Sequence, residues 1–205
     1  MLLLSSVSAG VSTPAWSQFM KGDVVLSTVV ATASKFFVPF TLPFVFKVLT
    51  SSTLSIDISS LFLTTFRLIF IPLGIALVTR RLAHQTIEKT KEHFGSISII
   101  LVMCVVYANV SHVQGYIMEN LLTVWKPLLA SYVFIFSLQI IGYFIAPWKS
   151  QTSRISLSIS ASYMNLTLAI VLAGLYFEPA VLLFVIITQI PLVTLVGIYK
   201  HIPRQ

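Results

Sequence analysis

Long apolar runs alternate with short polar breaks along most of the chain. A membrane-spanning helix needs about 20 mostly apolar residues, because the hydrocarbon core of a bilayer is about 30 Å thick. Runs of this length predict six membrane spans, over residues 24–49, 58–78, 97–116, 121–147, 155–176 and 180–199. The pattern therefore predicts an all-α integral membrane protein, a polytopic helical bundle that forms a single transmembrane domain over residues 1–205.

The first 20 residues follow a different pattern. Four apolar residues are followed by small and polar residues and by Pro14. We interpret residues 1–20 as half of a broken membrane helix, because irregular backbone is tolerated in a membrane where it lines a cavity. A leader peptide is the alternative, although the positively charged start of a signal peptide is missing.

Pro39 and Pro43 lie inside the first predicted span, Pro72 inside the second and Pro191 inside the last. Each proline removes a backbone donor and frees a carbonyl one turn earlier. Simple kinks are one outcome. The other is a break that exposes backbone groups near the bilayer midplane, where transporters bind substrates and ions.

Composition and charge agree with the membrane class. Hydrophobic residues make up 57% of the chain and charged residues only 9%, against roughly 25% charged in an average soluble domain. Lys and Arg concentrate in residues 80–91, 149–154 and 200–204 and are missing from the alternate connections. By the positive-inside rule the C-terminus is cytoplasmic, in a multi-pass protein of a plasma or inner membrane. The net charge of +7 is then topological and does not indicate a nucleic-acid partner.

Enzyme chemistry finds no support in the sequence. The four histidines are scattered through loops and ends without a paired acid at metal spacing, and the single cysteine, Cys104, lies in an apolar run. There is no Gly-rich phosphate loop and no nucleophile elbow. We therefore expect neither an enzyme nor a bound cofactor.

Lys35 is an exception to the apolar pattern, because it lies well inside the run 24–49, whereas all six acidic residues fall at the edges of apolar runs or between them. A cation at membrane depth costs roughly 2.5 to 3.5 kcal/mol, so it indicates function by default. An anionic substrate or loss of the lysine's proton would each resolve the imbalance, and both point to transport. The alternative is a side chain that extends toward the interface or a water-filled crevice.

Three stretches together resemble the bile acid:sodium symporter superfamily. Residues 20–27, Met-Lys-Gly-Asp-Val-Val-Leu-Ser, lead to Pro39 and Pro43 and resemble the passage from the fourth to the fifth helix of that family. Residues 72–74, Pro-Leu-Gly, resemble its sixth helix, and residues 154–169 resemble its ninth, whose second half begins around Asn165. The resemblance runs in order over nearly the whole chain.

This resemblance implies a ten-helix fold of two inverted five-helix repeats, with broken helices that cross and hold the substrate near the crossover. The chain would correspond to about helices 4 to 10, without the helices that precede them in the family. The implied function is secondary transport of a small organic anion or a related metabolite. The alternatives are a non-transporting truncated membrane remnant and a membrane-embedded accessory protein. The oligomeric state stays open.

The resemblance also implies where ions would bind. The family's sodium ligands fall on Thr13 and Pro14, on Ala31 and Thr32, and on Ser160 and Met164. Thr13 and Thr32 keep a hydroxyl and could form a residual sodium site, but the charged ligand is gone, whereas a hard cation needs several oxygens. Sodium coupling is therefore in doubt.

Lys35 follows Ala31 by four residues and so shares its helix face. Its ammonium could replace the metal's charge at the emptied ion site, or couple transport to a proton. A second prediction concerns the substrate: one polar cleft is lined by a set of small polar side chains, Ser12, Thr13, Ser17, Ser162 and Asn165. The alternative is that these small residues serve close helix packing.

Overall fold

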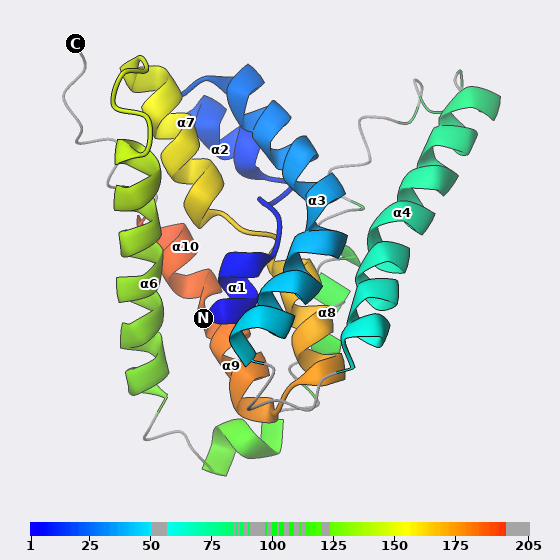
Figure 1. Cartoon of the computed structure of the whole chain (residues 1–205), viewed down its shortest axis with the longest axis vertical. Helices are drawn as coiled ribbons and strands as arrows, with labels where there is room; N and C mark the ends of the chain where they lie inside the picture. The colour runs from blue at the N-terminus through cyan, green and yellow to red at the C-terminus, as the bar shows by residue number, and fades with distance from the viewer. Residues whose placement is uncertain are drawn as a thin grey trace.

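The structure is a computed structural model. It describes residues 1–50, 57–83 and 124–195 and, between 85 and 119, residues 85, 87, 90, 97, 100, 101, 103, 104, 107, 108, 111 and 114–119. The named elements are all helices (Figure 1): α1 (Leu2–Ser6), α2 (Thr13–Phe19), α3 (Val24–Thr50), α4 (Ile58–Leu82), α6 (Trp125–Phe144), α7 (Gln151–Ser162), α8 (Leu166–Tyr176), α9 (Pro179–Ile187) and α10 (Gln189–Leu195). Nine of the 20 residues in the predicted span 97–116 lie outside the described residues.

Three of the described helices, α3, α4 and α6, are long and apolar enough to cross a membrane. Helix α8 and the α9–α10 pair are apolar but shorter. Helix α3 continues through Pro39 and Pro43, and α4 continues through Pro72, so these prolines do not break their helices. Long apolar helices of this kind are typical of an integral membrane protein.

The helix boundaries differ from the predicted spans in ways that local chemistry explains. Helix α4 runs beyond residue 78 to Leu82, and its last turn contains Arg80 and Arg81, cations that a helix C-terminus favours. Helix α6 covers only Trp125–Phe144 of the span predicted over 121–147. The span predicted over 180–199 is two helices that meet at Thr188, and its last four residues lie outside the described part.

Two predicted segments contain helix breaks. The span predicted over 155–176 is not one helix but two, α7 and α8, separated at residues 163–165. Residues 1–20, predicted as half of a broken helix, contain two short helices, α1 and α2, and the break between them. Helix α7 begins four residues before the predicted span because the hydroxyl of Ser150 accepts a hydrogen bond from the Ser153 N–H and caps it.

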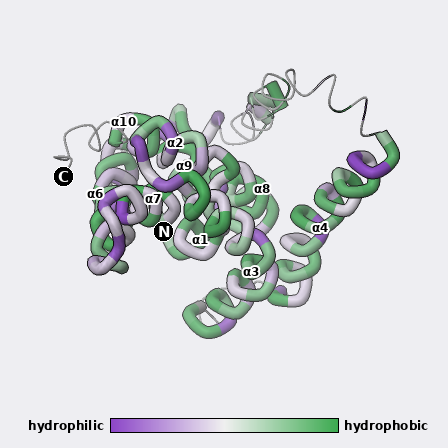
Figure 2. Tube along the Cα trace, turned by 90° about the horizontal axis from the view of Figure 1, so that it is seen from above, coloured by the Kyte–Doolittle hydropathy of each residue, from purple (hydrophilic) through white to green (hydrophobic). Residues whose placement is uncertain are grey.

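The broken helices pack between α6 on one side and α3 on the other (Figure 1). The core is apolar, and its completely buried side chains include Leu42, Phe46, Ile135, Ile159, Ile170 and Leu172. Figure 2 shows that α4 extends away from the other labelled helices. One end of α4 is attached to α8, because the Tyr176 hydroxyl lies 2.9 Å from Ser60 Oγ and 2.6 Å from Thr64 Oγ1.

Candidate functional site

The two helix breaks cross each other near the centre of Figure 1. An isolated antiparallel bridge pairs Ala9, between α1 and α2, with Met164, between α7 and α8. The Gly10 N–H donates to the Tyr163 carbonyl at 2.6 Å, and the Asn165 N–H donates to the Ser8 carbonyl at 2.7 Å. Non-helical backbone must be satisfied inside a membrane protein, since no water is available in the bilayer core. Here the two breaks satisfy each other.

Helix α3 and a glycine hold this crossing in place. Ser34 Oγ accepts from the Ala9 N–H at 3.2 Å and donates to the carbonyl of Ala31 at 3.1 Å. A Cβ atom added at Gly10 would lie 3.1 Å from the carbonyl oxygens of both Tyr163 and Met164. The two chains therefore approach so closely that glycine is the residue that fits best there.

A cavity of about 490 Å³ opens beside the crossing. Trp16 and Tyr163 form part of its wall, with ring centroids 5.5 Å apart, and the Tyr163 hydroxyl donates to the carbonyl of Leu192 on α10. The lining is mostly apolar with a few polar groups, as is usual for a small-molecule site. The lining residues are Gly10, Val11, Ser12, Trp16, Met103, Tyr163, Met164, Asn165, Leu166, Thr167, Gln189, Leu192 and Val193. We call this space the crossover cavity.

Asn165 lines the crossover cavity and precedes the first residue of α8. Its side-chain oxygen accepts a hydrogen bond from the Leu168 N–H at 3.2 Å, which caps the start of α8. Its side-chain nitrogen makes no hydrogen bond to the residues that the structure describes. One half of the amide therefore fixes the helix, and the other half can donate to a ligand.

The structure differs from the predicted cleft of five polar residues. Ser12 and Asn165 line the crossover cavity, but Thr13, Ser17 and Ser162 are completely buried outside its lining. Thr13 Oγ1 donates to the Tyr163 carbonyl at 3.2 Å, and Ser162 Oγ donates to the carbonyl of Ser158 at 2.9 Å. Hydroxyls on helices readily bond to nearby carbonyls in this way. Thr13 and Ser162 thus support the crossing and the end of α7, as the packing alternative expects.

The positions at which the family resemblance places sodium ligands are also dispersed. Ala31 is buried, and Met164 lines the crossover cavity. Ser160 is buried, and its hydroxyl has no hydrogen-bond partner among the described residues. Thr32 is exposed on α3 and lines a different pocket, whereas Thr13 is buried at the crossing. The structure does not bring the hydroxyls of Thr13 and Thr32 together in the crossover cavity. Pro14 lies in the first turn of α2, where its missing N–H is no loss.

Lys35 lies in that second pocket, between α3 and α4. The pocket has a volume of about 200 Å³ and is lined by Thr32, Lys35, Phe36, Ile69 and Leu73. Lys35 is half-buried there and does not line the crossover cavity. To replace the charge of a metal at the crossing, its side chain would have to leave this pocket. The geometry favours a role between α3 and α4.

Sequence reasoning missed two polar residues inside apolar runs. Gln189 lines the crossover cavity, and it interrupts the run 180–199. Arg67 is an exposed cation in the tenth position of α4. A polar residue within an apolar run is the signal that singled out Lys35, and the same signal would have identified both.

Comparison with protein families gives a clear result. The family model described as the sodium bile acid symporter family matches residues 1–120, more than half of the 205-residue chain. The chain belongs to the sodium bile acid symporter family. It is accordingly an integral membrane protein of the symporter type. A comparison with curated proteins found no match. The matched residues include α1 to α4 and the first break, while the resemblance of residues 154–169 to the family's ninth helix stays a prediction.

Proposed function

We propose that this family member is a secondary transporter that binds a small organic anion, or a related metabolite, in the crossover cavity. The observation that carries the proposal is the pairing of two helix breaks by backbone hydrogen bonds of 2.6 and 2.7 Å, beside a cavity of about 490 Å³. On this proposal the elements correspond to about helices 4 to 10 of a ten-helix inverted-repeat fold, with α1–α2 and α7–α8 as its crossing helices.

The start of α8 supports an anionic substrate. Leu166 and Thr167, the first residues of this 11-residue helix, line the crossover cavity. The N-terminus of a helix carries a partial positive charge, and broken helices of transporters direct such ends at anionic groups of substrates. The unpaired amide nitrogen of Asn165 and the side chain of Gln189 add neutral donors at the same place. Together they offer an anion several donors and no acidic side chain from the cavity's lining residues.

The proposed function is tested by uptake into liposomes that contain only the purified full-length chain. The probes are radiolabelled taurocholate and a set of short-chain carboxylates, with protein-free liposomes as the control. We expect saturable uptake of at least one anion above the control. If no anion in the set enters faster than into protein-free liposomes, the non-transporting alternative is correct instead.

Weak sodium dependence is the expected behaviour of such uptake. Sodium is bound by several oxygen ligands, and the residues lining the crossover cavity include no carboxylate. The hydroxyl of Thr13 is already bonded to Tyr163, and Thr32 lies in the other pocket. Exchange of external sodium for potassium at constant ionic strength should leave the initial rate of uptake nearly unchanged. A rate that collapses without sodium would show that an ion site exists despite the lost ligands.

The membrane orientation gives a separate prediction. Because Lys and Arg favour alternate connections, a reporter inserted near Gln85 and one fused after Gln205 should both be cytoplasmic. A reporter near Gln114 should lie outside. Paired fusions to alkaline phosphatase and green fluorescent protein measure this directly. Equal signals for the Gln85 and Gln114 fusions would refute the predicted number of crossings.

A further inference from the structure

Lys35 is a cation near the middle of α3, a helix long and apolar enough to cross a membrane, and it has no partner in the part of the chain that the structure describes. It follows Val24, the first residue of α3, by 11 positions, which places it about 16 Å along the helix at 1.5 Å per residue. Its ammonium makes no ion pair or hydrogen bond to the described residues. Since an unpaired charge is costly in an apolar environment, this position favours an anionic ligand.

The pocket around Lys35 is otherwise nearly apolar. Phe36 belongs to α3, and Ile69 and Leu73 are four residues apart on α4, so they present one face to α3. The hydroxyl of Thr32 is the other polar group in the lining. A volume of about 200 Å³ accommodates a small anionic group and the first carbons attached to it.

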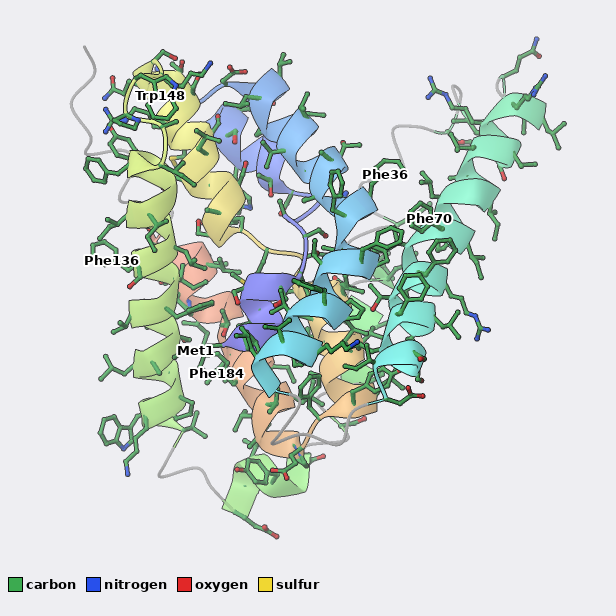
Figure 3. The ribbon with its side chains drawn as sticks, in the orientation of Figure 1. Met1, Phe36, Phe70, Phe136, Trp148 and Phe184 are labelled. Carbon is green, nitrogen blue, oxygen red and sulfur yellow. The ribbon has the colours of Figure 1, made fainter. Side chains whose placement is uncertain are left out.

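A series of phenylalanine rings continues from this pocket between α3 and α4. Phe36 lies 5.8 Å from Phe70, and Figure 3 shows these two side chains between the helices. The ring of Phe70 stacks on that of Phe66, with centroids 4.5 Å apart. The centroid of Phe62 lies 5.9 Å from that of Phe66 and 5.6 Å from that of Phe40. Phe62 and Phe70 are eight positions apart on α4, about 12 Å along the helix. We call these five residues the phenylalanine ladder.

We propose that the groove between α3 and α4 binds a long-chain fatty acid, with its carboxylate on the Lys35 ammonium and its acyl chain along the phenylalanine ladder. A carboxylate pairs with the ammonium by charge-assisted hydrogen bonds, which are stronger than neutral ones. The acyl chain covers rings that are otherwise exposed: the exposed fractions are 47% for Phe36 and 55% for Phe40.

The depth of Lys35 selects this ligand among membrane amphiphiles. A phospholipid head group carries a permanent charge and stays at the interface, whereas Lys35 lies about half-way through a core of about 30 Å. A fatty acid has a single chain and crosses the hydrocarbon core as the neutral acid. It can therefore bring a carboxyl group to the level of Lys35. Pairing with the ammonium then stabilises the ionised form.

Arg67 provides a matched control for this site. It lies on α4 two residues before Ile69, and two residues correspond to about 200° around a helix. Arg67 is exposed and does not line the pocket. It is therefore a second cation inside an apolar helix, on the side of α4 opposite Ile69.

The test is equilibrium binding of radiolabelled palmitate to the full-length protein in nanodiscs, with 1-hexadecanol as the neutral probe of equal chain length. Lys35→Met should weaken palmitate binding about tenfold or more, because charge-assisted hydrogen bonds are lost, and should leave hexadecanol binding nearly unchanged. Lys35→Arg and Arg67→Met should bind palmitate like the parent. A palmitate analogue with a photoreactive group near the carboxyl should label Ile69 or Leu73.

Leu73→Trp is the second variant, because it fills the pocket while the charge of Lys35 is retained, and it should weaken palmitate and hexadecanol binding alike. Equal palmitate affinity in Lys35→Met and the parent would overturn the proposal. A loss of palmitate affinity in Arg67→Met as large as that in Lys35→Met would also overturn it, as would labelling of Trp16 in the crossover cavity by the photoreactive analogue. Asn165→Ala should keep palmitate binding, so the outcome is independent of the proposed transport function.

Discussion

Gly142→Ala is expected to destabilise the protein, because it overpacks the contact between α6 and α7, and overpacking costs about 1–3 kcal/mol. A Cβ atom at Gly142 would lie 2.7 Å from Ser158 Cα, 2.8 Å from the carbonyl oxygen of Leu157 and 2.8 Å from Ala161 Cβ. Two of these atoms are backbone and the third is fixed to it, so rotation of a side chain cannot relieve the clash. The helices must separate.

Helix propensity acts in the opposite direction and is weaker. Alanine is favoured over glycine in a helix by about 0.8–1.0 kcal/mol, less than the upper part of the range expected for the clash. Gly74 on α4 is the control, since a Cβ atom added there would have no neighbour within 4 Å among the described residues. Gly74→Ala should therefore melt at the parental temperature or slightly above it. Thermal unfolding of the detergent-purified proteins measures the melting temperatures of both variants. A Gly142→Ala protein as stable as Gly74→Ala would disprove the close contact between α6 and α7.

The hydropathy pattern predicted the positions of the long helices but not the positions of the helix breaks. Helix α3 begins at the first residue of its predicted span and ends one residue beyond it, because both ends of that span coincide with changes in polarity. The break at residues 163–165 includes Tyr163 and Met164, which are apolar, so the run of hydrophobic residues continues through it. The partners that make this break stable, Ser8 and Gly10, lie more than 150 residues away in sequence. Only the family resemblance placed a helix start near Asn165.

The candidate site shows a similar division. The sequence identified Ser12 and Asn165, which line the crossover cavity, but it also grouped with them Thr13 and Ser162, whose hydroxyls bond to carbonyls instead. A hydroxyl on a helix can face a cavity or bond to a nearby carbonyl, and residue type does not distinguish the two. The environment of Lys35 could not be predicted either, because its pocket is completed by residues of α4.

Asn165→Asp is expected to abolish most anion transport while the fold is retained. Aspartate keeps an oxygen that can accept from the Leu168 N–H, and Asp and Asn cap helices about equally well. The same change replaces the free amide nitrogen by a negative charge in the crossover cavity, where it repels an anion. Loss of a hydrogen bond to a charged group alone corresponds to about 1.5–3 kcal/mol, roughly a tenfold to hundredfold lower uptake at limiting substrate.

Asn165→Ser separates capping from substrate binding. Serine also caps helices well. Its shorter side chain has no amide group, so the variant loses the amide donor without gaining a charge. The serine variant should therefore melt like the parent and transport at an intermediate rate, between the parent and the aspartate variant. Initial uptake rates and melting temperatures of the parent, Asn165→Ser and Asn165→Asp, measured in the same liposome preparation, test this order of uptake rates. Parental uptake by a well-folded Asn165→Asp protein would place the anion elsewhere than beside Asn165, because a carboxylate in the cavity would then be without effect.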